Sequence, residues 1–205
     1  MQAQAMTFQE RVAFNIAANE AFIKIIFPNE KFISDITEIK TKNKYIKGLI
    51  IPENVKVAES RIPINTEQSN TLRKELRMAK ILTLSGDSIY LIPEPSKYKE
   101  RVADAIINGI PYEFRNVENK VRKIETRFGD AKKKGTDINV FLNIDAEIDI
   151  NEARRRVGLV LARHPEYTGK IIVSIKGGIP YFWDTNSFRQ KNPLPFGRVR
   201  YPGRN

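Results

Sequence analysis

An acid and a base stand two positions apart in the stretch INGIPYEFRNV, residues 107–117. Side chains alternate along a strand, so Glu113 and Arg115 share one face, and Tyr112, Phe114 and Asn116 share the other. A carboxylate can take a proton from a hydroxyl group, and a guanidinium can stabilise charge that builds on a phosphate. A structural ion pair explains the same two residues equally well, because a buried charge needs a partner.

A turn precedes this pair. Asn108-Gly109 is a favoured two-residue hairpin turn, and it separates the apolar run DAIING from IPYEFRNV. Asp104 is expected on the strand before the turn, where the hairpin can bring it close to Glu113 or Arg115. Three charged groups would then converge on one sheet face and form an acid–base centre.

The composition limits the kinds of ligand and partner that the protein is expected to bind. The chain has 205 residues, a formal net charge of +11, no cysteine and one histidine. The charge favours a polyanionic partner, most often a nucleic acid, although a basic surface without function is the alternative. Cysteine metal sites and disulfides are excluded, and zinc is not expected. The sequence contains no apolar run long enough to span a membrane.

Basic residues gather in two places that suit a nucleic-acid backbone. The first is a predicted basic helix and the strand before it, with the candidates Lys120, Arg122, Lys123, Arg127, Lys132, Lys133 and Lys134. The second is the tail, where Arg198 and Arg200 stand among Phe196 and Tyr201, a composition that suits single-stranded RNA. A solvated helix face and a docked tail are the structural alternatives.

The remaining pattern predicts the elements that position these residues. A capped helix is expected over 7–27, one or two strands within 44–65, and a polar boundary at 65–70. Thereafter we expect a helix over 69–82, a strand at 88–94, the hairpin, a basic helix ending at Gly135, a strand at 137–144, and a helix beginning after Asp149 or Asn151. A final hairpin follows, over 169–184. His164 is expected at the end of the last helix, where the helix dipole favours a cation.

This order indicates an α+β fold with a mostly antiparallel sheet packed by helices, preceded by a small helical and strand-containing N-terminal element. The predicted division is an element of unknown role over 1–66, a nuclease-like domain over 67–188, and a basic tail over 189–205.

The runs RKELRMAKIL, ADAIINGIPYEFRNV and DINVFLNI, with the basic helix between the last two, resemble the C-terminal nuclease domains of bacterial polymorphic toxins, notably the tRNA-cleaving toxins of contact-dependent growth inhibition. Similar domains occur on phage head-morphogenesis proteins, and the group is assigned to a barnase/EndoU/colicin/RelE-like ribonuclease fold. The motif positions present are Glu75, Asp104, Gly109, Glu113 and Ala131-Lys132. The chain departs from the pattern at Ala103 for proline, Arg115 for lysine, and Lys134 for glutamine.

The resemblance implies a metal-independent endoribonuclease that acts on RNA, with tRNA as the expected substrate and no cofactor. Its catalytic residues would be Glu113, Arg115, Asp104 and Glu75. It also implies action in the bacterial cytoplasm, delivery by a secretion system or phage particle, and an immunity protein as partner.

Two alternatives stay open. A non-catalytic phage or mobile-element protein could retain the fold for nucleic-acid binding or assembly. The same letters also resemble the PD-(D/E)xK nucleases, in which Asp104 and Glu113 would hold Mg²⁺. Arg115 fits that mechanism poorly, because an arginine cannot give up a proton at neutral pH.

Overall fold

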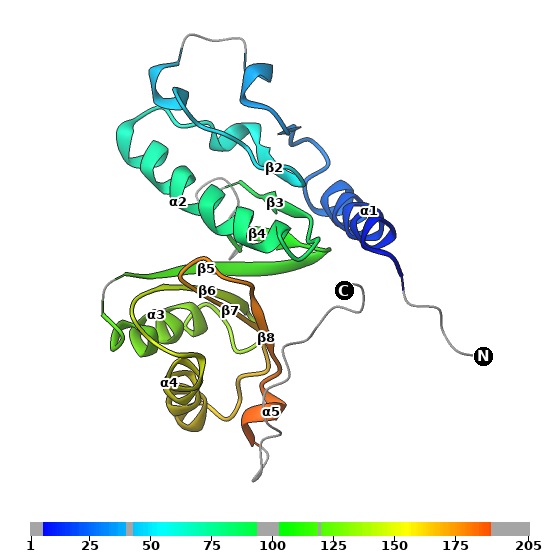
Figure 1. Cartoon of the computed structure of the whole chain (residues 1–205). Coiled ribbons are helices and arrows are strands. Elements are labelled where there is room, and N and C mark those ends of the chain that lie inside the picture. The colour runs from blue at the N-terminus through cyan, green and yellow to red at the C-terminus, as the bar shows by residue number, and fades with distance from the viewer. Residues whose placement is uncertain (1–5, 40–42, 94–102, 119, 190–205) are drawn as a thin grey trace, which may run out of the picture. The chain divides into compact units, whose positions relative to one another are not determined.

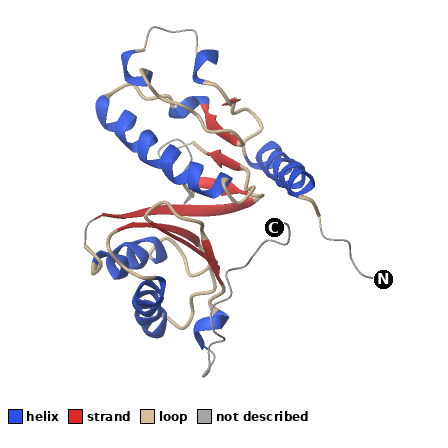
Figure 2. Ribbon diagram, in the orientation of Figure 1, coloured by secondary structure: helices blue, strands red, loops and turns tan. Residues whose placement is uncertain are grey.

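The computed structural model describes residues 6–39, 43–93, 103–118 and 120–189, and these form an α+β fold, as predicted (Figure 2). The chain divides into two compact units between Pro111 and Tyr112. The first unit therefore contains both the expected N-terminal element and the helix expected to open the nuclease-like domain. The predicted division by role, at residue 66, stays a prediction. The predicted tail from residue 190 onward, with Arg198 and Arg200, lies outside the described residues.

The first unit carries a sheet in the order β1-β2-β3-β4 (Figure 1). Its elements are α1 (Phe8–Ile26), β1 (Phe32–Ile33), β2 (Val55–Ala58), α2 (Thr66–Thr83), β3 (Ile89–Leu91) and β4 (Ala105–Ile107), with three short 3-10 helices at Ile36–Glu38, Lys44–Ile46 and Glu59–Arg61. The β1/β2 and β3/β4 pairs are antiparallel, and β2 pairs parallel with β3 across the connection that contains α2.

Helix α1 begins where the sequence predicts. The Thr7 side chain accepts a hydrogen bond from the backbone N–H of Glu10, and the Glu10 carboxylate accepts one from the backbone N–H of Thr7. This reciprocal capping satisfies donors that the first turn of a helix leaves open. At the other end of α1, Ile23 and Phe27 pack against Tyr90 and Ile106 of the sheet.

Helix α2 begins earlier than predicted. The polar run at 65–70 was expected to be a turn and a boundary, but Asn65 caps a helix there by accepting a hydrogen bond from the Gln68 N–H. The buried residues Leu72, Leu76 and Ala79 lie on one face of this helix. The early start shows that polar residues in a first helical turn are compatible with a helix when a cap is available.

The predicted hairpin turn is confirmed. Asn108 and Gly109 have φ angles of 52° and 79°, the positive values that a type I′ turn requires at both central positions. The Asn108 amide accepts a hydrogen bond from the Ser88 N–H at 2.9 Å and donates one to Asp87 at 2.7 Å. The Gly109 N–H donates to the Asn19 side chain at 2.7 Å, so α1 fixes the turn from outside the hairpin.

The second unit is a sheet in the order β5-β6-β7-β8. Its elements are β5 (Ile110–Glu118, whose first two residues belong to the first unit), α3 (Lys123–Lys132), β6 (Asn139–Asp145), α4 (Ile150–Arg163), β7 (Ile171–Ile175), β8 (Tyr181–Trp183) and α5 (Asn186–Arg189). Strands β5, β6 and β7 pair parallel, and β8 joins antiparallel as the partner of the predicted final hairpin. Helices α3 and α4 lie next to each other beside this sheet (Figure 1).

The core of the second unit lies between the sheet and these helices. Val117 of β5 and Leu142 of β6 point to the helix side and are buried with Phe128 of α3 and Val157 of α4. Glu113 and Arg115 stand four and two positions before Val117, so their side chains share its face of β5 and also face the helices. Helix α3 is shorter than predicted, because β5 extends to Glu118 and the helix begins only at Lys123.

Candidate functional site

Glu113 holds two cations in the second unit. The Arg115 guanidinium forms an ion pair with Glu113 Oε1, and the Lys134 Nζ lies 2.5 Å from the same oxygen. Arg115 also donates to the carbonyl of Phe114 at 2.7 Å. Lys134 follows α3, the helix that connects the parallel strands β5 and β6. This connection brings the chain back to β5, where Lys134 meets Glu113.

Burial differs among the three groups. The Glu113 side chain is completely buried, whereas the side chains of Arg115 and Lys134 are 21% and 33% exposed. A buried carboxylate is costly unless it is paired. The two cations satisfy that need and still reach solvent, so this arrangement presents positive charge at the surface above a fixed negative anchor.

Lys134 supplies the lysine ammonium that the motif lacks at position 115. The sequence singled out Lys134 as a nucleic-acid-binding residue and did not place it at Glu113. The sequence holds one hint of this contact. A lysine directly after a helix that connects two parallel strands can reach residues at the start of the first strand. Spacing of 21 residues along the chain gives no distance by itself.

Glu75 and Asp104, the other two predicted catalytic residues, belong to the first unit. Arg61 lies 2.5 Å from the Glu75 carboxylate and donates to the backbone carbonyl of Asp104 at 3.3 Å. The side chains of Arg61 and Glu75 are 5% and 11% exposed. Sequence reasoning missed Arg61 because it stands on a short 3-10 turn without a recognisable pattern. Asp104 lies directly before β4 rather than within a strand.

The predicted nucleic-acid-binding residues around α3 divide into two groups. Lys133 is 77% exposed on its side chain and pairs with Asp130. The Lys133 hydrogen bond is the main cause of the lowered pKa of the Asp130 carboxyl, and the charges of Arg127 and Arg115 also lower it. The other exposed members are Lys120, Arg122, Lys123 and Arg127.

Lys132 is half-buried and takes part in a separate cluster. Its Nζ lies 2.6 Å from His164 Nδ1 and 3.3 Å from the Glu166 carboxylate. His164 follows the last residue of α4, the position that the sequence predicted. The Glu166 pKa is lowered first by a backbone hydrogen bond and further by Lys132 and His164. Lys132 therefore contributes to internal contacts as well as to the basic surface.

In the described part of the chain, no group of three or more His, Asp and Glu side chains could hold a metal ion. Nor does any helix within the described ranges have the length and apolar character to cross a membrane.

Comparison with solved structures finds a weak likeness. A solved structure described as a CdiA-CT/CdiI toxin and immunity complex from Burkholderia pseudomallei is similar over 58% of this chain and 89% of that chain, with 20% sequence identity and a TM-score of 0.43. A likeness at this level carries no inference about activity. No family model and no curated protein matches the chain.

Proposed function

We propose that the second unit cleaves RNA without a metal, with Glu113, Arg115 and Lys134 as its reactive centre. The observation that carries the proposal is that both cations pair with one oxygen of the buried glutamate while their side chains reach solvent. A phosphate that approaches from solvent competes with Glu113 for these two cations. Binding would therefore place a phosphodiester next to the carboxylate and weaken the carboxylate's own ion pairs at the same time.

The proposed reaction uses the ribose 2′-hydroxyl as nucleophile. Its oxygen bonds to the adjacent phosphorus, its proton passes to Glu113, and the bond from phosphorus to the 5′-oxygen breaks. Arg115 stabilises the charge on the phosphate oxygens, and the Lys134 ammonium gives a proton to the departing 5′-oxygen. The products are a 2′,3′-cyclic phosphate and a 5′-hydroxyl. The proposed role of Glu75 and of the Asp104 carbonyl is to hold Arg61 in position within the first unit.

The decisive experiment incubates the purified chain with total tRNA, with a DNA oligonucleotide, and with an RNA oligonucleotide that has deoxyribose at the cleaved position. Each reaction is run with and without EDTA, and product ends are identified by mass spectrometry. We expect cleavage of tRNA to survive EDTA, to leave cyclic phosphate ends, and to stop at the deoxy position because the nucleophile is gone. Cleavage of DNA that EDTA abolishes and Mg²⁺ restores would instead support the metal-dependent alternative.

Complete burial of Glu113 favours a second candidate function. A carboxylate that is 0% exposed serves well as an anchor for two phosphate-binding cations, even without proton transfer. The chain would then bind nucleic acid for packaging or assembly and cleave nothing. Binding of RNA without any cleaved product in the experiment above would select this alternative.

The proposed setting follows from the motif resemblance. It comprises action on tRNA in the bacterial cytoplasm, delivery by a secretion system or phage particle, and an immunity protein that covers the basic surface. Co-expression of candidate immunity proteins with the chain, followed by a toxicity assay, tests it.

A further inference from the structure

A second basic site lies in the first unit, between α2 and the segment at residues 48–52. A pocket of about 410 Å³ opens there, a size typical of small-molecule sites. Three cations of α2 line it, Arg73, Arg77 and Lys80. No acidic side chain is among the described residues that line it. None of these cations belongs to the centre around Glu113.

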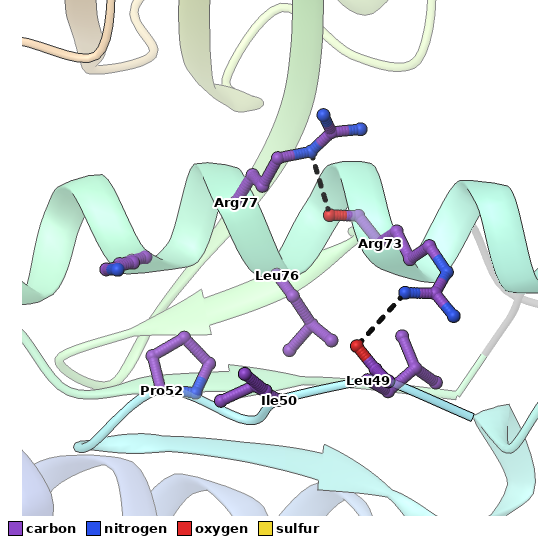
Figure 3. A pocket seen from close by; sticks show the side chains of 8 residues that line it. Leu49, Ile50, Pro52, Arg73, Leu76 and Arg77 are labelled. Carbon is purple, nitrogen blue, oxygen red and sulfur yellow. Dashed lines mark hydrogen bonds between the residues drawn. The ribbon is translucent and has the colours of Figure 1, made fainter. Parts of the chain in front are cut away.

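The cations are arranged differently from one another. Arg73 donates to the carbonyls of Lys47 at 2.6 Å and Gly48 at 3.2 Å, so its guanidinium is fixed against the segment (Figure 3). Arg77 donates to the Arg73 carbonyl through Nε at 3.3 Å, and the residue is exposed. Lys80 stands three positions after Arg77, so both side chains project from neighbouring places on α2.

The rest of the lining is apolar. Leu76 points from α2 toward the segment that carries Ile50 and Pro52, and Leu49 completes this wall (Figure 3). Leu49 and Leu76 are buried, but Ile50 is 78% exposed. A large exposed isoleucine beside three cations is suited to a ligand that has both a flat apolar part and a negative charge.

We propose that this pocket binds one nucleotide of an RNA strand, with its phosphate at Arg77 and Lys80 and its base against Ile50 and Pro52. The fixed guanidinium of Arg73 offers a second flat surface for the base, since arginine planes stack on bases. The choice of RNA among phosphate-bearing ligands rests on the proposed function. An acidic peptide would use the cations but leave the apolar wall uncovered.

The test uses 5′-AMP as the probe, and adenosine and inorganic phosphate as partial probes. The full chain is labelled with carbon-13 at isoleucine and leucine methyl groups and titrated by NMR. We expect 5′-AMP to shift the Ile50 and Leu76 methyl signals and to bind at least ten times more tightly than adenosine or phosphate alone. A mononucleotide has no internucleotide bond, so the result does not depend on whether the chain cleaves RNA.

The variant Arg77→Gln/Lys80→Gln should weaken 5′-AMP binding at least tenfold. The matched control Lys24→Gln/Lys31→Gln removes the same charge from exposed positions of the first unit outside the pocket, and should stay within twofold of the parent. For a single-stranded RNA oligonucleotide, the slope of log affinity against log salt should fall by about 0.7 in the pocket variant, because one phosphate contact is lost and each such contact in single strands accounts for about 0.7.

Three results would overturn the assignment. One is an unmoved Ile50 methyl signal at saturating 5′-AMP, and another is equal loss of affinity in the control and pocket variants. The third is a hexaglutamate peptide that binds as tightly as 5′-AMP and shifts the same methyl groups, which would make the pocket a docking place for acidic protein. If the nucleotide binds as expected while no RNA is cleaved, the site stands and the proposed cleavage fails.

Discussion

Both units contain a buried glutamate paired with arginine, and the two pairs differ in how far the cation reaches solvent. In the first unit Arg61 and Glu75 are 5% and 11% exposed and the arginine also caps the Asp104 carbonyl. In the second unit Glu113 is completely buried, but Arg115 and Lys134 are 21% and 33% exposed. The cation of the first pair is enclosed within its unit, whereas both cations of the second reach solvent.

The difference teaches that the same pair of residue types can act as structure or as a site. A closed pair resists change because either partner alone would be a buried, uncompensated charge. An open pair loses less when an anion replaces the carboxylate, since water and ligand can solvate the cations. Exposure of the cation, rather than presence of the pair, therefore distinguishes the centre proposed for RNA from the pair in the first unit.

The largest effect is expected from breaking the closed pair. Glu75→Gln leaves Arg61 buried and uncompensated, and should lower the free energy of unfolding by about 3–5 kcal/mol. Glu113→Gln should cost less, because Arg115 and Lys134 can turn toward solvent. Urea unfolding followed by circular dichroism measures both, and fluorescence of Trp183, the single tryptophan and a residue of β8, reports on the second unit. Equal destabilisation by the two variants would remove the distinction.

Next comes the effect on cleavage. Arg115→Gln should reduce kcat/KM on tRNA by about 100- to 1000-fold, the usual loss for one charge-stabilising donor. Arg155→Gln is the control, because Arg155 is exposed on α4 of the same unit and pairs with Glu152 one turn earlier on that helix. Its rate should match the parent. A fully active Arg115→Gln enzyme would show that the open pair is not the reactive centre.

A third buried carboxylate, Asp87, differs from both pairs because burial is the main influence on its pKa. Asp87 is 1% exposed, and burial raises its pKa to about 6, although the Asn108 amide and the charge of Arg11 act in the opposite direction. The folded state thus holds this proton more tightly than the unfolded chain. Protonated Asp87 therefore adds to the free energy of unfolding. This contribution is fully present below about pH 4 and is lost as the pH rises through about 6.

Asp87→Asn should remove this pH dependence. Between pH 4 and pH 7 the parent should lose about 2–3 kcal/mol relative to the variant, since one pKa unit corresponds to about 1.4 kcal/mol. Thermal or urea unfolding at both pH values gives the double difference, in which other titrating groups cancel. A constant difference between parent and variant would mean that Asp87 is charged throughout.

The smallest effect is expected at the outer basic surface. Lys133→Glu, at a side chain that is 77% exposed, should reduce the salt slope of single-stranded RNA binding by about 0.7 without changing the cleavage rate at saturation. Lys132→Glu would disturb the contacts with His164 and Glu166 as well, so it is unsuitable as a test of surface charge alone. An unchanged slope would leave Lys133 as part of a solvated helix end.

Local signals in the sequence gave correct elements. Thr7 with Glu10 predicted the start of α1, and Asn108-Gly109 predicted the turn. Asp149, one of the two caps expected for α4, is the one that the structure shows. Each of these signals depends on neighbours within a few residues. The late start of α3 was missed because strand and helix compete for the polar residues after Val117, and the strand gains pairing with β6 as far as Glu118.

Long-range contacts were beyond the sequence alone. The placement of Lys134 at Glu113 depends on the path from β5 through α3 to β6, and the pairing of Arg61 with Glu75 depends on how a short turn packs on α2. The alternation that put Glu113 and Arg115 on one face was predictable from strand geometry. Which cations reach solvent could not be, because exposure is set by everything that packs around them.

The turn at Asn108-Gly109 affects how fast the protein is chemically damaged over time. An asparagine followed by glycine is prone to deamidation, in which the glycine nitrogen bonds to the side-chain carbonyl carbon, the bond to the side-chain nitrogen breaks, ammonia leaves, and a cyclic imide remains. Here the Asn108 amide is engaged at both its oxygen and its nitrogen, and the Gly109 N–H is committed to Asn19. The folded chain thereby shields a bond that would be among the first to decay in the unfolded one, and conversion to isoaspartate should track the fraction of time that this hairpin spends open.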